Sequence, residues 1–240
     1  MREFALITGA SGGIGQAIAA ELAARGYNLY LHYNLNKEAV ERLSAKLSVH
    51  GGEYVPVRAD FSKLGGYKEL LPSLVGVNAI VHCGGTAAYG LFQDMEDEEV
   101  AGLFNIHVLN PILLTKALIP ELLKKRTGGI VFISSIWGQT GAACETVYSA
   151  AKGAQITFVK ALGKELAPSG IRVNAIAPGA VETAMLSGFA PEELEVLSGD
   201  IPMGRLGRPE EIANAAAFLL SGEASYITGH ILSVNGGWYT

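Results

Sequence analysis

The sequence predicts an α/β fold: a single-domain, doubly wound, parallel seven-stranded sheet of the Rossmann-like type, with helices on both faces. Short β-type runs alternate with helix-type stretches from one end of the 240 residues to the other, which is the pattern of strand–helix–strand units. Most of these runs are continuously apolar, as is expected of strands buried on both faces. No repeat, linker or low-complexity tract divides the chain, so residues 1–240 are expected to form one domain.

The spacing of hydrophobic residues predicts which segments form strands and which form helices. Seven strands are predicted, at Phe4–Ile7, Leu29–His32, Tyr54–Arg58, Ala79–His82, Ile130–Ser134, Arg172–Ala177 and Ile231–Val234. Ile14, Ile18 and Leu22 recur every four residues and indicate a crossover helix. Further helices are expected around Val40, Leu43 and Leu47, from about Glu98 to Lys125, over Thr146–Ala167 and from Pro209 onward. The stretch Pro178–Pro202 is predicted to be an irregular lid or substrate loop.

The composition favours a globular protein of the reducing cytoplasm. Hydrophobic residues make up 49% of the chain and charged residues 17%, enough apolar material for a large core. The net charge of −5, with scattered cations, gives no basic surface for nucleic acid or an anionic membrane. The first apolar run is too short for a signal peptide, and no stretch is expected to reach the length of a membrane span. Cys83 and Cys144 lack metal-ligand spacing, so neither a metal site nor a disulfide framework is expected.

A glycine-rich loop follows the first predicted strand and leads directly into a helix. Its sequence is Thr8-Gly9-Ala10-Ser11-Gly12-Gly13-Ile14-Gly15. A helix N-terminus offers free amides and a positive dipole to a pyrophosphate, and glycines let that group approach the backbone. At the first strand–helix turn of a parallel sheet, this context predicts dinucleotide binding. The residues expected to contact the dinucleotide here are Gly9, Ser11, Gly12, Gly13, Ile14 and Gly15.

Three side chains predict chemistry at a carbonyl or an alcohol. Tyr148 and Lys152 lie one helical turn apart, where the ammonium can lower the pKa of the phenol. A tyrosine tuned in this way can donate a proton to a carbonyl oxygen, or take one from an alcohol, near neutral pH. Ser135 lies at the end of a predicted strand, thirteen residues before Tyr148, and its hydroxyl is expected to hold the substrate oxygen.

These motifs together resemble the short-chain dehydrogenase/reductase family over essentially the whole chain. The most similar members are the bacterial 3-oxoacyl-acyl-carrier-protein reductases, through Ile212-Ala213-Asn214-Ala215, Ser225-Tyr226-Ile227-Thr228-Gly229 and Val234-Asn235-Gly236-Gly237. The resemblance implies that Ser135 orients the carbonyl, Tyr148 is the acid/base and Lys152 binds the nicotinamide ribose. It also implies the strand order 3-2-1-4-5-6-7 and a homotetramer formed through Thr146–Ala167 and the C-terminus.

The resemblance also extends the expected cofactor site beyond the glycine loop. Asp60 resembles the family's adenine-contacting aspartate, and a turn or N-cap role beside Ser62 is its alternative. His82-Cys83-Gly84-Gly85 stands where the family usually has Asn-Asn-Ala-Gly, so that only the last glycine is kept, which still lets the cofactor's ribose pass close. Further cofactor contacts implied by the resemblance are Phe61, Gly84, Gly85, Pro178, Gly179, Val181 and Thr183.

His107 marks the main departure from the family pattern. It aligns with the asparagine that completes the family's proton relay, while the nearby Asn105 is two positions out of register. Two interpretations stay open for this side chain. Either the imidazole replaces the asparagine as a polar relay, or it is simply a satisfied group between helices.

The cofactor is expected to be NADPH rather than NADH. An acid at the end of the second strand would hold the ribose diol of NAD, but this position reads His32-Tyr33-Asn34. The arginine that many NADPH-dependent relatives place before Gly-Ile-Gly is Gly13 here. Asn34, Lys37 and the backbone are therefore the expected partners of the 2′-phosphate.

The sequence leaves two ketone substrates open. A 3-oxoacyl group on an acidic carrier protein, or a small-molecule ketone, fits the reductase type, with Lys124-Lys125-Arg126 as candidate docking residues, although Ser169 replaces a second basic position. The chain also looks like the reductases that convert the 5-aminopentanone group on a lysine of elongation factor P, in which case Glu145 or Glu182 would face the substrate's ammonium. A non-enzymatic dinucleotide-binding regulator is a third reading, opposed by the complete serine, tyrosine and lysine set.

Overall fold

The computed structural model describes residues 2–240. Within that range seven strands form one sheet in the order β3-β2-β1-β4-β5-β6-β7, and every neighbouring pair is parallel. The predicted fold class is thus confirmed, and the ends of the strands differ from the predicted ones by at most two residues. The strands are β1 (Phe4–Thr8), β2 (Asn28–Tyr33), β3 (Tyr54–Arg58), β4 (Val77–His82), β5 (Gly128–Ile133), β6 (Ile171–Pro178) and β7 (Ile231–Val234).

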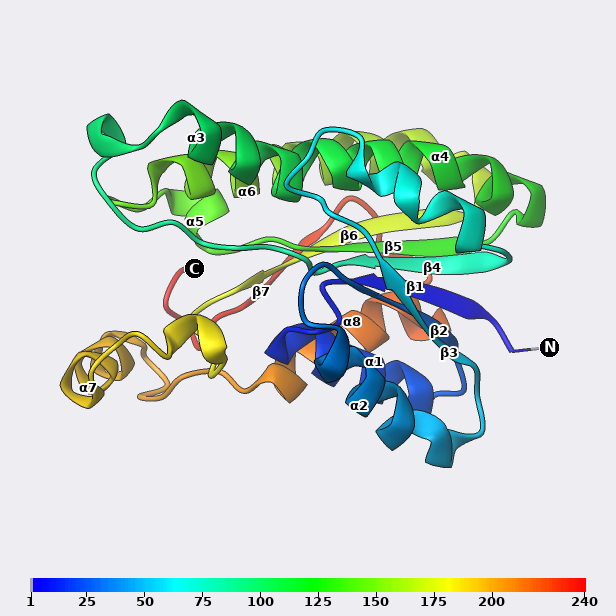
Figure 1. The fold of residues 1–240 in the computed structure, drawn as a ribbon, viewed down its shortest axis with the longest axis horizontal. Helices are drawn as coiled ribbons and strands as arrows, with labels where there is room; N and C mark the ends of the chain where they lie inside the picture. The colour runs from blue at the N-terminus through cyan, green and yellow to red at the C-terminus, as the bar shows by residue number, and fades with distance from the viewer. Residues whose placement is uncertain (1) are drawn as a thin grey trace.

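Helices cover both faces of the sheet, as predicted (Figure 1). One face carries α1 (Gly13–Ala24), α2 (Lys37–Leu47) and α8 (Pro209–Leu220). The opposite face carries α3 (Asp97–Phe104), α4 (Asn110–Lys125), α5 (Trp137–Thr140) and α6 (Thr146–Leu166). A further helix, α7 (Pro191–Asp200), projects from the side of the molecule where the strands end (Figure 1).

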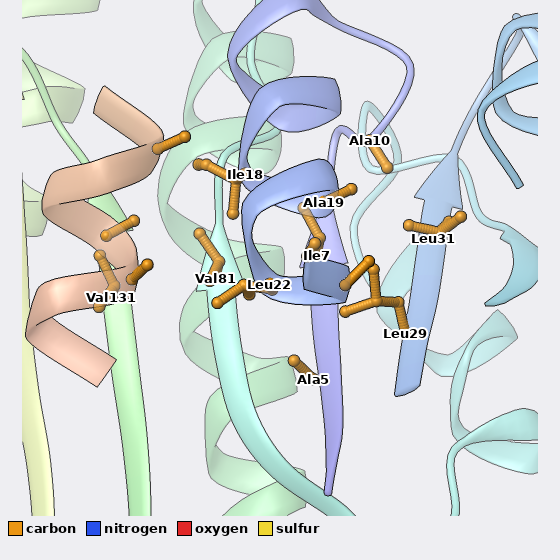
Figure 2. Packing of buried hydrophobic residues seen from close by; sticks show 14 of the residues in the cluster. Ala5, Ile7, Ala10, Ile18, Ala19, Leu22, Leu29, Leu31, Val81 and Val131 are labelled. Carbon is orange, nitrogen blue, oxygen red and sulfur yellow. The ribbon is translucent and has the colours of Figure 1, made fainter. Parts of the chain in front are cut away.

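The sheet divides the core into two layers. Because side chains alternate along a strand, Ala5 and Ile7 of β1 lie in the layer under α1, whereas Leu6 lies in the layer under α4 and α6. Ile18 and Leu22 of α1 are fully buried among the strand residues of the first layer (Figure 2). Burial of each such side chain contributes roughly 1.5–3 kcal/mol. This packing fixes the start of α1, and with it the glycine loop, on the sheet.

The helix expected from Glu98 to Lys125 is interrupted. A π turn over Asn105–Leu109 separates α3 from α4. Pro111 explains the interruption, because it has no N–H for the carbonyl of His107 four residues earlier, and its ring crowds that carbonyl. The amide of Asn110 accordingly donates to the carbonyl of Asn105, five residues back.

The prediction that Pro178–Pro202 is irregular is wrong for part of the segment. The stretch contains a 3₁₀ turn over Ala184–Leu186 and the helix α7. Pro191 stands at the start of α7, and the Glu193 carboxylate accepts a hydrogen bond from the Ala190 amide at 2.8 Å, both of which are helix-start signals. No residue of α7 is buried, so hydrophobic spacing could not reveal it.

The expectation that no stretch reaches the length of a membrane span also needs correction. Asp97–Lys125 is long and apolar enough by composition, with a mean hydropathy of 1.4 in one window. Its apolar residues have a place inside the fold, because Leu114, Leu118 and Leu122 of α4 are buried against the sheet. The apolar character of the stretch is therefore that of a helix covering a core.

Candidate active site

The predicted cofactor residues gather at one edge of the sheet, where its parallel strands end. The glycine loop links β1 to α1, Asn34 follows β2 and Asp60 follows β3. Gly84 and Gly85 follow β4, and β6 ends at Pro178, just before Gly179. Since β3, β2, β1 and β4 are consecutive in the sheet and only β5 separates β4 from β6, these strand ends lie along one edge. Ligands of open α/β sheets bind at such an edge.

Two positions of the glycine loop have no room for a side chain. Gly9 has a φ of 70°, and a Cβ added there would lie 2.5 Å from the Cα of Gly84. A Cβ on Gly15 would overlap the carbonyl oxygen of Gly9. Gly12 precedes α1 without a side-chain cap, so the first amides of that helix remain available to an anion. The loop thus fits the pyrophosphate of a dinucleotide.

The segment after β6 meets the glycine loop from the other side. Val181 forms a β-bridge with Gly207. The side chain of Thr183 lies so near the glycine loop that a Cβ added at Gly13 would be 3.0 Å from the threonine Cγ2. The loop is also fixed at Ser11, whose carbonyl accepts a hydrogen bond from Gln16 Nε2 at 2.9 Å. The contact between Gly13 and Thr183 brings residues 170 positions apart in the chain to the same edge of the sheet.

Two residues that sequence reasoning missed hold this loop in shape. The Oγ1 of Thr8 accepts hydrogen bonds from the amides of Cys83 and Gly84, at 3.1 and 3.2 Å. The Nδ1 of His32 accepts one from the Gly9 amide at 3.2 Å, so its Nε2 carries the hydrogen and donates to the Ala59 carbonyl at 3.1 Å. Burial lowers the pKa of His32 to about 4, which keeps Nδ1 free as an acceptor. The available signal was a polar residue at the end of each apolar strand.

Asn34, Asp60 and Phe61 lie together at the ends of β2 and β3. Asn34 Nδ2 donates to Asp60 Oδ1 at 3.1 Å, and the same oxygen accepts from the amide and the hydroxyl of Ser62 at 3.0 and 2.6 Å. The turn role of Asp60 is therefore present. Phe61 stacks on the ring of His32, with centroids 4.5 Å apart. Arg58, another residue that the sequence did not single out, donates to the Asn34 carbonyl and side-chain oxygen, both at 3.4 Å.

Ser135, Tyr148 and Lys152 are brought together as predicted. Ser135 lies two residues beyond the end of β5, and its hydroxyl is near enough to Tyr148 to lower the pKa of the phenol. Its Oγ also accepts a hydrogen bond from the Trp137 amide at 3.1 Å. The ammonium of Lys152 lies 5.4 Å from the centroid of the Tyr148 ring and donates to the Ile133 carbonyl at 2.7 Å. All three side chains belong to the layer that β5 and α6 form at the carboxyl end of the sheet.

The expected lowering of the Tyr148 pKa by Lys152 is not what the structure gives. Burial raises the pKa of Tyr148, Glu145 raises it further, and the nearby Ser135 hydroxyl opposes both effects. The Lys152 ammonium is engaged with the Ile133 carbonyl rather than with the phenol oxygen. Burial lowers the pKa of Lys152 itself to about 8. At neutral pH the phenol is therefore protonated, as a proton donor must be.

His107 is buried beside this cluster, in the π turn. Its ring meets the Tyr148 ring edge-on, with centroids 5.3 Å apart, and its Nε2 lies 2.7 Å from the Thr86 carbonyl oxygen. Burial, and then the charge of Lys152, lower the pKa of His107 to about 3, so the ring is neutral. A Cβ on Gly85 would overlap the ring. The structure thus places His107 against Tyr148. The sequence alone could not decide whether the imidazole lies beside the predicted proton donor.

The two candidate acids differ in their surroundings. Glu145 directly precedes α6, three residues before Tyr148, and burial raises the pKa of its carboxyl. Glu182 is exposed on the segment after β6. Only the first of the two combines partial burial with a position next to the predicted proton donor.

The basic run Lys124-Lys125-Arg126 does not lie at the edge of the sheet where the candidate site residues gather. Lys125 Nζ donates to the Gly76 carbonyl at 2.9 Å, just before β4 begins, and Lys124 pairs with Glu121 at 3.1 Å. The run therefore occupies the amino-terminal edge of the sheet, opposite Tyr148. The expectation that it borders the site of the same chain is wrong.

Comparisons with known proteins agree with this architecture. A family model described as enoyl-(acyl carrier protein) reductase matches residues 9–239. A Bacillus subtilis (strain 168) protein named as the uncharacterized oxidoreductase YmfI is 54% identical over 241 residues, covering 100% of both chains. The 3-oxoacyl-[acyl-carrier-protein] reductase FabG of Escherichia coli (strain K12) is 37% identical over 238 residues, covering 99% of this chain and 97% of the relative.

A solved structure gives the same result in three dimensions. The 3-oxoacyl-[acyl-carrier protein] reductase from Brucella melitensis superimposes with a TM-score of 0.92 at 33% identity, over 99% of this chain and 91% of that one. Fold, site and comparisons define an oxidoreductase built on a dinucleotide-type α/β sheet. The chain belongs to the short-chain dehydrogenase/reductase family.

Proposed function

We propose that this oxidoreductase is an NADPH-dependent ketone reductase of the 3-oxoacyl-acyl-carrier-protein reductase type. The observation that carries the proposal is the cluster of Ser135, Tyr148 and Lys152 at the edge of the sheet where the glycine loop also lies. A non-enzymatic dinucleotide-binding regulator would have no use for a buried lysine beside a tyrosine and a serine. The family's identity as oxidoreductases supports the same choice.

The chain's own residues divide the work of such a reduction. NADPH supplies the hydride that the ketone carbon receives. Ser135 donates a hydrogen bond to the ketone oxygen, and Tyr148 delivers its phenol proton to that oxygen as negative charge develops there. Lys152 binds the nicotinamide ribose and offers positive charge beside the phenol. Hydride and proton together convert the ketone to a secondary alcohol.

The remaining predicted residues are assigned to the cofactor. The residues of the glycine loop that hold its pyrophosphate are Gly9, Ser11, Gly12, Gly13, Ile14 and Gly15. Asp60 and Phe61 are assigned to the adenine, Gly84 and Gly85 to the adenosine ribose. Pro178, Gly179, Val181 and Thr183 are assigned to the nicotinamide end, in keeping with the position of Thr183 against the glycine loop.

Arg58 supports NADPH over NADH. No acid stands at the end of β2 to hold a ribose diol, and Arg58 contacts Asn34 at that point. An arginine near this position accommodates a 2′-phosphate.

Arg58→Leu is therefore expected to weaken binding of 2′,5′-ADP by about 10-fold or more and to leave ADP binding unchanged, as measured by calorimetry. Arg42→Leu, on the outer side of α2, is the matched control. Equal losses for both nucleotides would refute the assignment.

Two substrates compete for the site. The relatives named 3-oxoacyl-[acyl-carrier-protein] reductases favour a carrier-protein-bound or small-molecule 3-oxoacyl group. The partly buried carboxyl of Glu145, three residues before Tyr148, favours a substrate with a primary ammonium, such as the 5-aminopentanone group of elongation factor P. The position of the basic run away from the site removes one argument for the carrier protein.

The deciding experiment follows NADPH oxidation with an acetoacetyl thioester and, separately, with 5-aminopentanone-modified elongation factor P. Turnover of the thioester supports the acyl reductase, and turnover of the modified factor alone identifies a protein-modification enzyme. Glu145→Gln is expected to raise KM only for the ammonium-bearing substrate. Failure with both substrates would sink the reductase proposal.

We also propose a homotetramer in the cytoplasm. Ala150, Thr157 and Ala161 on α6 are small and exposed, and Tyr226 near the C-terminus is fully exposed, which suits surfaces covered by a second copy. Both cysteines are free, as in a reducing compartment. Sedimentation equilibrium tests the assembly, and a monomer of 25.2 kDa would contradict it.

A further inference from the structure

The carbonyl of His107 cannot make the i+4 hydrogen bond of an α-helix, and the sequence supplies the cause. In an α-helix this carbonyl would accept from the amide four residues later, but that residue is Pro111, which has no N–H. A buried main-chain carbonyl left without a donor costs about 1–3 kcal/mol. A donor from another element can take the place of the missing amide at this point.

Gln155 of α6 is that donor. Its Nε2 donates to the His107 carbonyl oxygen at 2.7 Å, and the Gln155 side chain is buried. Gln155 lies seven residues after Tyr148 and three after Lys152, and this spacing places the three on one face of α6. One hydrogen bond thus ties the π turn to the helix that carries both predicted catalytic residues.

A second hydrogen bond sets the tautomer of the His107 imidazole. A carbonyl oxygen can only accept, so the contact with Thr86 puts the ring hydrogen on Nε2 and leaves Nδ1 as a bare acceptor. No partner for Nδ1 is found within residues 2–240. The ring also meets Tyr148 edge-on, and the Lys152 ammonium is near enough to lower its pKa. His107 therefore offers one neutral acceptor beside the two predicted catalytic groups.

We propose that Gln155 is a positioning residue for the reaction. By holding the His107 carbonyl, it keeps the imidazole and its bare Nδ1 in place beside Tyr148 and Lys152. The inference rests on the proposed function of this site. Gln155 acts through His107 and is assigned no contact of its own with the substrate or the cofactor.

Gln155→Met tests the proposal, because it keeps the length of the side chain and removes the donor. The kcat for ketone reduction is expected to fall by about 10- to 100-fold, the cost of a small misplacement in a reacting group. KM for the ketone and the affinity for NADPH are expected to stay unchanged. Gln139→Met is the matched control, since the Gln139 side chain is hydrogen-bonded to Ser233 on β7, at 3.5 Å, and within residues 2–240 has no hydrogen bond to His107.

A spectroscopic readout separates positioning from general damage. ¹⁵N spectra of the histidine rings, assigned with His107→Asn, should show His107 neutral with its hydrogen on Nε2. In Gln155→Met the His107 signals should change while those of His32 and His82 stay. Pro111→Ala restores the missing amide and competes for the same carbonyl, so it should change the same signals with Gln155 intact, even if Gln155→Met does not fold.

The outcomes distinguish this proposal from the function on which it rests. Unchanged His107 signals in both variants would overturn the positioning role. Changed His107 signals with an unchanged kcat would show that the hydrogen bond from Gln155 does not contribute to the reaction, and this would overturn the proposal. If the wild-type chain reduces no ketone, the proposed function fails, and the spectra still decide whether Gln155 holds His107.

Discussion

Tyr148 is the side chain on which the proposed chemistry depends. Its burial and the nearby Glu145 both raise its pKa, so the phenol stays protonated at neutral pH and is suited to donate to a ketone rather than to deprotonate an alcohol. Tyr148→Phe keeps the ring that packs on His107 and removes only the hydroxyl. We expect kcat to fall by roughly 10²- to 10⁴-fold with NADPH affinity retained, as measured by steady-state kinetics and fluorescence titration. Substantial residual turnover would contradict the assigned role.

His107 can act only as a neutral group. With its pKa lowered to about 3, it carries no charge at working pH, so it is limited to accepting or donating hydrogen bonds. His107→Asn should lower kcat by about 10-fold or more, because the shorter amide cannot reach Thr86 and also present an acceptor at the same place. A kcat equal to or above that of the wild type would show that the imidazole is a satisfied core group.

Residues with a short-range signature could be found from the sequence, and residues defined by long-range contacts could not. Tyr148 and Lys152 are four positions apart on one helix, so local spacing alone placed them together. Gln155 acquires its role from a proline 44 positions earlier, and Arg58 from Asn34, which directly follows the neighbouring strand. Such contacts depend on strand order and helix packing, which hydrophobic periodicity does not encode.

At the scale of elements, apolar runs predicted every strand, because the strands of a covered parallel sheet are buried on both faces. The same criterion failed for α7, which buries no residue, and at the π turn, where the backbone rather than the hydrophobic pattern changes. The interruption follows from a missing N–H at Pro111.

The contact between α5 and α6 sets the distance from Ser135 to Tyr148. Gly138 of α5 packs so closely that a Cβ would lie 2.7 Å from the carbonyl carbon of Lys152, and Ser134 Oγ donates to the Lys152 carbonyl at 3.0 Å. Gly138→Ala should cost about 1–3 kcal/mol of stability through overpacking and lower kcat as well. Urea unfolding and steady-state kinetics measure the two effects.

Gly102→Ala provides the comparison at a helical glycine without such a contact. Within residues 2–240, no atom apart from its chain neighbours and the backbone of its own helix lies within 4 Å of a Cβ added there, so the variant should gain up to about 1 kcal/mol from helix propensity and keep its activity. If Gly138→Ala behaved like Gly102→Ala, the close approach of the two helices would not be what positions the site.

For the whole molecule, the edge that serves the site is also where polar groups are buried. Thr8 and His82 end their strands inside the protein, His32 lies one residue before the end of β2, and His107 lies in the helical layer above them. Thr8, His32 and His107 are hydrogen-bonded to the loops, and His82 is hydrogen-bonded to Thr115 of α4, so positioning the site requires ionisable rings to be buried. The consequence is a stability that depends on pH.

Three buried histidines should make the fold sensitive to mild acid. Burial lowers the pKa of His32 to about 4 and of His82 and His107 to about 3, from an ordinary value of 6.5. Below pH 6.5 the unfolded chain therefore binds protons that the native state does not, and stability falls until the pH reaches these lowered values. Each histidine contributes about 1.4 kcal/mol per pH unit, and the three together roughly three times that. Urea unfolding at about pH 7, 6 and 5 measures this dependence of the free energy of unfolding on pH. His82→Gln should reduce the slope by about a third. A free energy of unfolding that is independent of pH in this window would show that the rings are protonated in the native state.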